Sequence, residues 1–149
     1  MDSYAELYEN NPAGSTITVV VAGNFYQWVT TTVGQSGPTD LAVPSAATDD
    51  ITIGVNGAGL YGVMVISSFN GSNNAVAEVA VHVNGALQPN LQISRKLSAA
   101  GDEGAVSISG LLVLAAGDVV DLRVSSDGAG DVVIIKHANL TIFSIVRDK

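Results

Sequence analysis

The side chains best suited to acid–base or metal chemistry are few along this 149-residue chain. His82 and His137 are the only two histidines, and cysteine is absent. His82 lies on the polar side of an alternating segment, which predicts a solvent-facing or interface imidazole, and His137 is predicted to lie in a turn. No H-x-H, H-E-x-x-H, G-x-S-x-G or phosphate-loop spacing occurs. We therefore predict no enzyme activity, no catalytic residue and no cofactor.

The segment Asp127-Gly-Ala-Gly-Asp131 is the best candidate for a metal site. Two carboxylates and free carbonyl groups on a glycine-rich turn suit a hard cation such as Ca²⁺. The same residue types are also preferred in hairpin turns. The turn is favoured and no metal ligand is predicted, with calcium binding kept as the alternative.

Phe25, Tyr26 and Trp28 form an aromatic cluster that has two interpretations. An exposed cluster would stack on sugar rings, as the receptor-binding tip of a fibre requires. A strand would instead send Tyr26 and Trp28 to one face and Phe25 to the other, so that both faces pack against the protein. Packing is the favoured interpretation.

These residues lie on segments in which apolar and polar side chains alternate with a period of two, as in a sheet that is buried on one face. Turn residues separate the segments, no helical period is present, and residues 34–50 are predicted to be a long surface connection. The pattern predicts an all-β sandwich in one domain, residues 1–149. The expected strands are Tyr4–Tyr8, Thr16–Ala22, Phe25–Val33, Ile51–Val55, Leu60–Phe69, Val76–Val83, Leu91–Leu97, Ala105–Ser109, Val119–Ser125, Val132–Lys136 and Leu140–Val146.

Two of these strands are apolar on both faces, which predicts burial on both. In Leu60–Phe69, one face carries Tyr61 and Val63 while the other carries Met64 and Ile66. A two-layer sandwich covers only one face of each sheet, so the second must be covered by another subunit or another segment. The residues predicted at a subunit interface are Tyr61, Val63, Phe69, Phe143 and Ile145.

The composition supports an interface and excludes two classes of partner. Hydrophobic residues make up 47% of the chain and charged residues only 13%, whereas about a quarter to a third of a soluble domain's surface is usually charged. The net charge of −8 would repel a phosphate backbone, so no nucleic acid is expected. No apolar run is long enough for a bilayer and the acidic N-terminus does not resemble a signal peptide, so no membrane and no export are expected.

The N-terminal segment, residues 1–11, has two equally weighted interpretations. Tyr4, Leu7 and Tyr8 alternate with acidic residues, which suits an edge strand added to a neighbouring protein. These three residues are therefore the predicted attachment residues. The same pattern also suits the first strand of the domain itself.

Two motifs carry a resemblance to a known family. Gly59-Leu60-Tyr61 opens an apolar strand, and Leu114, Gly117, Asp118, Val120 and Leu122 form a Leu-x-x-Gly-Asp-x-Val-x-Leu pattern. Together they resemble the C1q/TNF-like jelly-roll family, which implies a jelly-roll β-sandwich and a homotrimer with the strand after Gly59 near the threefold axis. The final strand departs from the family's Phe-x-Gly-Phe pattern and no collagen-like stalk is present, which places the chain nearer the compact jelly rolls of tailed phages.

The resulting hypothesis is a structural virion protein of a tailed bacteriophage, acting as a head decoration, knob or fibre protein through trimeric assembly. Its expected partners are its own copies and a capsid or tail subunit, and its expected location is the virion. The alternative is a receptor- or carbohydrate-binding tip of a tail fibre that uses the loops Asn70–Asn74, Asn84–Pro89 and Asp127–Asp131. A secreted C1q-like signalling domain is disfavoured, because no export signal is recognised.

Overall fold

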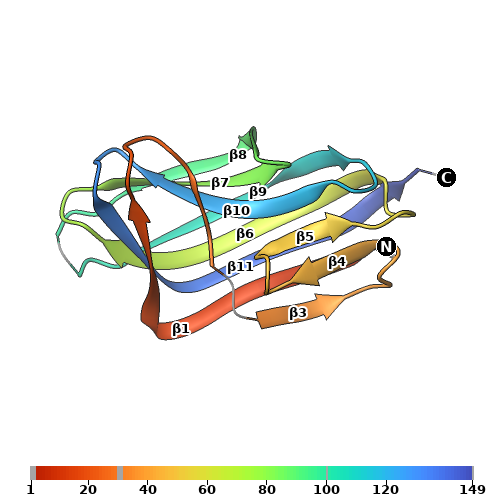
Figure 1. Cartoon of the computed structure of the whole chain (residues 1–149), viewed down its shortest axis with the longest axis horizontal. Helices are drawn as coiled ribbons and strands as arrows, with labels where there is room; N and C mark the ends of the chain where they lie inside the picture. Colours follow the sequence, from red (N-terminus) through yellow and green to blue (C-terminus); the bar gives the residue numbers. More distant parts are fainter. Residues whose placement is uncertain (1–2, 30–31, 100, 149) are drawn as a thin grey trace.

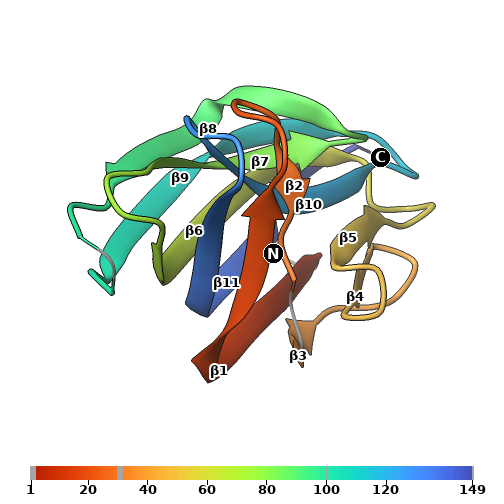
Figure 2. The same ribbon diagram turned by 60° about the vertical axis from the view of Figure 1, so that its left-hand side comes forward.

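Two antiparallel sheets are stacked on each other in the computed structural model, which describes residues 3–29, 32–99 and 101–148 (Figures 1 and 2). One has five strands in the order β3-β1-β11-β6-β9, and the other contains β4-β5-β10-β7-β8 with β2 paired to β10. No helix occurs within these ranges. The strands are β1 Tyr4–Val19, β2 Tyr26–Gln27, β3 Thr32–Ser36, β4 Ala42–Ser45, β5 Asp50–Ile53, β6 Gly59–Gly71, β7 Val76–Val83, β8 Ala86–Lys96, β9 Gly104–Leu114, β10 Val119–Ser126 and β11 Asp131–Arg147.

Four of the expected strands merge into two long ones in the five-stranded sheet. Tyr4–Tyr8 and the part of Thr16–Ala22 up to Val19 belong to β1, and the last two expected strands belong to β11. The pairing of β1 with β11 continues past a β-bulge between Asn10 and Ser15, and a bulge lets a strand bend without ending. The prediction that His137 lies in a turn is therefore wrong, because it lies inside β11 beside a second bulge.

The expected surface connection over residues 34–50 contains strand structure. The end of β3 and the whole of β4 lie within it, and β4 pairs with β5 from Ala42 opposite Ile53 to Ser45 opposite Asp50. Both are short edge strands that contain Gly34 or Pro44, and proline is tolerated only at edges. Such strands lack a clear alternation, so the sequence pattern missed them. Thr30 and Thr31, within the expected strand Phe25–Val33, and Met1, Asp2, Ala100 and Lys149 lie outside the described residues.

The core lies between the sheets, where the inward side chains of both meet. Trp28 is buried there, and its ring meets the Phe69 ring edge-on at 6.4 Å. Tyr26 is half-buried beside the core, and its hydroxyl accepts a hydrogen bond from the Val21 N–H at 2.9 Å. The packing interpretation of this aromatic cluster is therefore confirmed for Trp28.

The turns divide between the two ends of the sandwich. Asn84 and Gly85 join β7 to β8 with φ angles of 51° and 78°, the left-handed conformation that a two-residue hairpin turn requires. In Figure 1 both termini lie at the right-hand end, and the Ser144 N–H donates to the Ser3 carbonyl there. The turns β1–β2, β6–β7, β8–β9 and β10–β11 lie at the opposite end.

Tyr61 closes the core at the end that carries the termini. Its buried hydroxyl donates to the Gly57 carbonyl at 2.6 Å and lies 2.7 Å from the Ser3 hydroxyl. Replacing Tyr61 with Phe leaves two buried polar groups without this partner, which costs about 1–3 kcal/mol. We expect urea unfolding of Tyr61→Phe to show that loss, while the exposed-ring control Tyr4→Phe changes little. Equal stability of the two variants would contradict this role of the hydroxyl.

Candidate functional site

The outer face of the five-stranded sheet, which is the side turned away from the six-stranded sheet, is the candidate site. Figure 2 shows β9, β6, β11 and β1 side by side in this sheet. Half the surface of Met64 and 80% of that of Val113 remain exposed. Large apolar side chains rarely stay exposed as a contiguous group on a monomer. The exposed apolar residues here are Tyr4, Met64, Ile66, Leu111, Val113, Ile145 and Val146.

Strand register arranges the outward side chains in rows that run across the sheet. The rows nearest the termini are apolar, and the rows become more polar toward the opposite end. This gradient divides the outer face into an apolar part and a polar part. The rows, starting from the termini, are Val146, Leu60 and Val113; Tyr4, Phe143, Gly62 and Leu111; Glu6, Thr141, Met64 and Ser109; Tyr8, Asn139, Ile66 and Ser107; and Asn10, His137, Ser68 and Ala105.

Gly62 allows the centre of the apolar part to form. The Phe143 ring lies over this glycine, and a side chain at position 62 would collide with it. A hollow of about 390 Å³ beside the ring is lined by Met64, Leu111 and Ile145 among others. A second hollow of about 590 Å³ lies in the polar part and is lined by Tyr8, Ile66, Ser107 and His137 among others.

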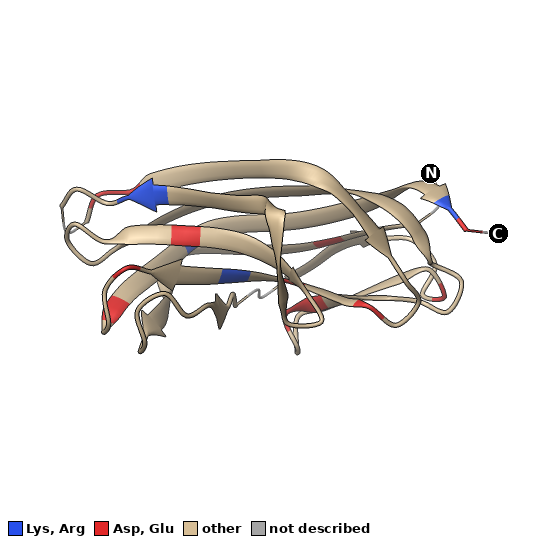
Figure 3. Cartoon of the chain, turned by 90° about the horizontal axis from the view of Figure 1, so that it is seen from above, with Lys and Arg blue, Asp and Glu red and all other residues tan. Residues whose placement is uncertain are grey.

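Charge is almost absent from this face. The 13 residues of β6 and the 11 residues of β9 include no charged side chain. Glu6 on β1 is held by Asn139, whose amide donates to its carboxylate at 2.8 Å, and Thr141 donates to the same Asn139 at 2.5 Å. In Figure 3 the charged residues are few and lie largely at turns and strand ends. Within the described residues no helix is long and apolar enough to cross a bilayer.

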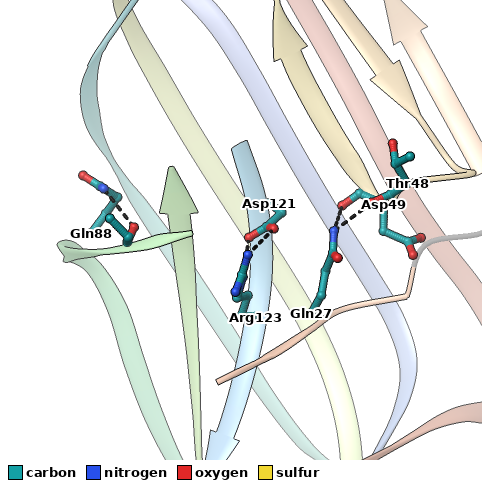
Figure 4. A network of polar contacts seen from close by, with 7 residues as sticks. Gln27, Thr48, Asp49, Gln88, Asp121 and Arg123 are labelled. Carbon is teal, nitrogen blue, oxygen red and sulfur yellow. Dashed lines mark hydrogen bonds and ion pairs between the residues drawn. The ribbon is translucent and has the colours of Figure 1, made fainter. Parts of the chain in front are cut away.

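The outer face of the six-stranded sheet is different, because it carries a polar network (Figure 4). Arg123 donates two hydrogen bonds of 2.9 Å to Asp121, which raises the pKa of the guanidinium further above its usual value. Gln27 donates to the carbonyls of Thr48 and Asp49 at 2.8 and 3.1 Å. Burial raises the pKa of Asp50, and the hydrogen bond from Thr48 only partly opposes this shift.

The structure corrects the side of β6 that was predicted to meet another subunit. Tyr61, Val63 and Phe69 point toward the six-stranded sheet and are at most 1% exposed, so they have no surface left to bury. Phe143 lies on the outer face, and Ile145 lies at the bulge between Ser144 and Val146 where β11 pairs with β6. The outward residues of β6 include Met64 and Ile66, which the sequence pattern had placed on the face opposite to the predicted interface residues.

The N-terminal segment forms part of the fold. β1 pairs with β11 on one edge and with β3 on the other, so the first-strand interpretation holds. Leu7 is fully buried and is not an attachment residue, whereas Tyr4 is exposed and Tyr8 half-buried on the outer face.

Two further expectations are changed by the structure. His82 was expected at the surface or an interface but is 4% exposed within one chain. The predicted tip loops do not meet, since Asn84–Pro89 follows the end of β7 that is opposite to Asn70–Asn74 and Asp127–Asp131. These last two loops share one end of the sandwich, where the Asp127 N–H donates to the Val76 carbonyl.

The acidic turn uses its carboxylates within the protein. Asp127 accepts the Val76 N–H at 2.9 Å, and Asp131 accepts the Ser126 hydroxyl at 2.6 Å. No group of three or more His, Asp or Glu side chains suited to a metal ion occurs in the part of the chain that the structure describes.

Comparison with known proteins identifies the class of fold. No protein-family model matches the chain, and no curated protein matches it by sequence. The structure is similar to that of the Eiger TNF from S. frugiperda, with a TM-score of 0.70 at 13% identity, over 99% of this chain and 94% of that one. It is also similar to the globular domain of the zebrafish complement 1qA protein, with a TM-score of 0.65 at 15% identity, over 99% and 100% of the two chains. The fold is therefore a C1q/TNF-like jelly-roll sandwich, as the sequence motifs predicted.

We expect the acidic turn to need no metal. Addition of EDTA should leave the melting temperature unchanged, because hydrogen bonds already occupy both carboxylates. Asp127→Ala should lower stability by about 0.5–1.5 kcal/mol through the loss of the bond from Val76, equally with and without calcium. Melting followed by calorimetry tests both statements. A drop in melting temperature with EDTA that calcium restores, and that Asp127→Ala abolishes, would show that the turn holds a cation.

Proposed function

We propose that this chain is a structural assembly protein that forms a homotrimer through the outer face of its five-stranded sheet. The observation that carries the proposal is the uncharged apolar part of that face, from Tyr4 across Phe143 and Gly62 to Leu111. Water would otherwise cover this surface, and its removal from water is favourable by about 25 cal/mol per Å². Obligate interfaces commonly bury roughly 2,000 Å² or more, which a sheet face of this kind can supply.

The edge strands support a ring of subunits. β8 is an edge strand with Pro89, Arg95 and Lys96, which are residue types that prevent a further strand from adding. β9 is also an edge strand but has no proline and no charge over its length. A partner that covers the β9 edge with its own outer face makes a contact between unlike surfaces. Such contacts form a ring when the rotation between neighbouring subunits closes. The C1q/TNF-like fold supports three as the number of subunits.

The proposal extends to the setting of the trimer: it is a component of a tailed-phage virion, as a head decoration, knob or fibre protein. The supporting features are the sequence resemblance to compact phage jelly rolls and the shape of the molecule, with both termini at its apolar end (Figure 1). In this arrangement the end of the sandwich that carries both termini lies against a capsid or tail subunit. The turns at the opposite end face solvent.

A receptor- or carbohydrate-binding tip is the second candidate. The observation that favours it is that Asn70–Asn74 and Asp127–Asp131 share the end opposite to the termini, where a fibre tip presents its loops. In this case the trimer is the same, and its function is binding rather than coverage.

We expect sedimentation velocity to show a trimer at micromolar concentration. Met64→Glu or Leu111→Glu would place an unpaired carboxylate in the interface at a cost of several kcal/mol. Because each 1.4 kcal/mol is a factor of ten, that cost should raise the dissociation constant roughly a hundredfold or more. Val20→Glu is the matched control, because Val20 is as exposed as these residues but lies in the β1–β2 turn. A wild-type monomer, or equal effects of all three variants, would refute the assembly surface.

We expect purified phage particles from cells that express the chain to contain it in a fixed ratio to the capsid or tail protein, with a copy number divisible by three. Quantitative mass spectrometry of the particles measures the ratio, and electron microscopy with a labelled antibody measures the position. Absence of the chain from purified particles would contradict the proposed virion role but not the proposed trimer. Binding to a glycan array that is lost on replacing residues 70–74 would favour the fibre tip.

A further inference from the structure

His82 is a buried imidazole on the side of the molecule away from the assembly surface. It lies in β7 with its side chain on the outer face of the six-stranded sheet, where 4% of the residue is exposed. The Phe25 ring covers it, with the two ring centres 4.9 Å apart and tilted by 58°. The Nδ1 atom of His82 is buried and has no hydrogen-bond partner.

The charged groups around His82 come from two neighbouring strands and from β7 itself. On β10, Asp121 is its cross-strand neighbour and Arg123 lies two residues further along. On β5, Asp50 is the neighbour of Asp121 on the far side. Glu78 lies on the same face of β7, whereas β8 places the uncharged Leu87 opposite His82. Residues 20–27, which include Phe25, contain no charged side chain.

The charge of Asp121 is already paired with that of Arg123, which donates to both of its carboxylate oxygens, so the nearby guanidinium offsets the attraction of Asp121 for a protonated His82. Protonation would give the imidazole two N–H donors, one of them on the buried Nδ1 that lacks a partner. A buried charged donor without an acceptor is strongly unfavourable. Burial accordingly lowers the pKa of His82, and the backbone of Ala80 and the charge of Asp121 only partly oppose the shift.

The segment over His82, residues 20–27, is held to the six-stranded sheet by a small set of contacts. They include the Gln27 side-chain bonds to the carbonyls of Thr48 and Asp49 and the packing of the half-buried Tyr26 beside the core. β2 contributes two residue pairs with β10, Gln27 with Arg123 and Tyr26 with Val124. One further backbone bond joins Gly23 to Ser126 at 2.8 Å. The residues on either side, Val19 and Trp28, are buried in the core. The segment can therefore lift between two fixed points while the sandwich stays folded.

We propose that His82 and Phe25 form an acid-sensitive switch, in which protonation of His82 releases residues 20–27 from the six-stranded sheet and lets water reach the imidazole. The switch is separate from the assembly surface, because it lies on the other sheet. Release would expose Phe25 next to Val20 and Val21, which are already exposed, and so create a larger apolar surface at the end opposite to the termini. Neutral pH keeps the segment closed.

The sign of the pH dependence follows from the lowered pKa. The unfolded or opened chain has a histidine pKa of about 6.5 and binds more protons than the closed state below that pH. The closed state therefore loses stability as the pH falls from about 6.5 through the lower pKa of the folded protein, and the loss stops below it. Asp50, with its raised pKa, has the opposite slope at lower pH, so the measurements stay above about pH 5.

Hydrogen exchange followed by mass spectrometry, corrected for the intrinsic pH dependence of exchange, tests the switch between about pH 5 and about pH 8. In the wild-type protein we expect residues 20–27 to lose protection severalfold on acidification while β6 and β9 keep theirs. His82→Gln, which cannot be protonated, should show constant protection. Glu78→Gln, which removes a titratable group from the same face of β7 and lies away from the assembly surface, is the matched control and should behave as wild type. Unchanged protection, protection that rises because the imidazolium packs better on Phe25, or an equal loss in His82→Gln would overturn the proposal.

A second measurement does not depend on how His82→Gln folds. NMR titration of the His82 ring in the wild-type protein should give a midpoint below about 6.5, and Phe25→Ala should move it up toward that value by uncovering the ring. An unmoved midpoint in Phe25→Ala would show that Phe25 does not control access to the imidazole. Sedimentation at each pH records the oligomeric state alongside, so that loss of the trimer and opening of residues 20–27 are scored separately.

Discussion

The pairing of β11 with β1 on one side and β6 on the other is the constraint on which the rest of the structure depends. β11 is 17 residues long, and its register sets which residues of three strands stand next to each other. Side chains alternate between faces, so a slip by one residue would exchange the core face with the outer face. The same register that buries Leu7 and Ile142 therefore brings Tyr4, Phe143 and Gly62 into one outward row.

The two outer faces of the sandwich have opposite chemistry. On the five-stranded sheet, neighbouring strands without charge leave an apolar surface whose burial by another copy is favourable. On the six-stranded sheet, Asp121 and Arg123 satisfy each other and leave His82 dependent on the Phe25 ring for its cover. The proposed assembly surface and the proposed acid-sensitive switch thus lie on separate layers of one domain, on either side of the shared core.

Local patterns predicted much of the fold. The strand Val76–Val83 has the bounds expected from its alternation, and the Asn84-Gly85 pair that follows it forms a hairpin turn. In the Gly-Asp motif, Asp118 follows Gly117, whose φ is 88°, and accepts the Ala115 N–H at 2.8 Å. These features depend on residues close together in the chain, so their sequence signals are strong.

The sequence by itself determined that Leu60–Phe69 is apolar on both faces and that the chain forms a jelly-roll sandwich. Only the tertiary structure decided which face is core, because a period of two separates two faces without saying which one meets the second sheet. It also decided that His82 is buried, since the ring that covers it comes from Phe25, far earlier in the chain. The β-bulge that carries β1 past Asn10 likewise depends on its pairing with β11. Burial and register are set by contacts between distant segments, which local alternation does not encode.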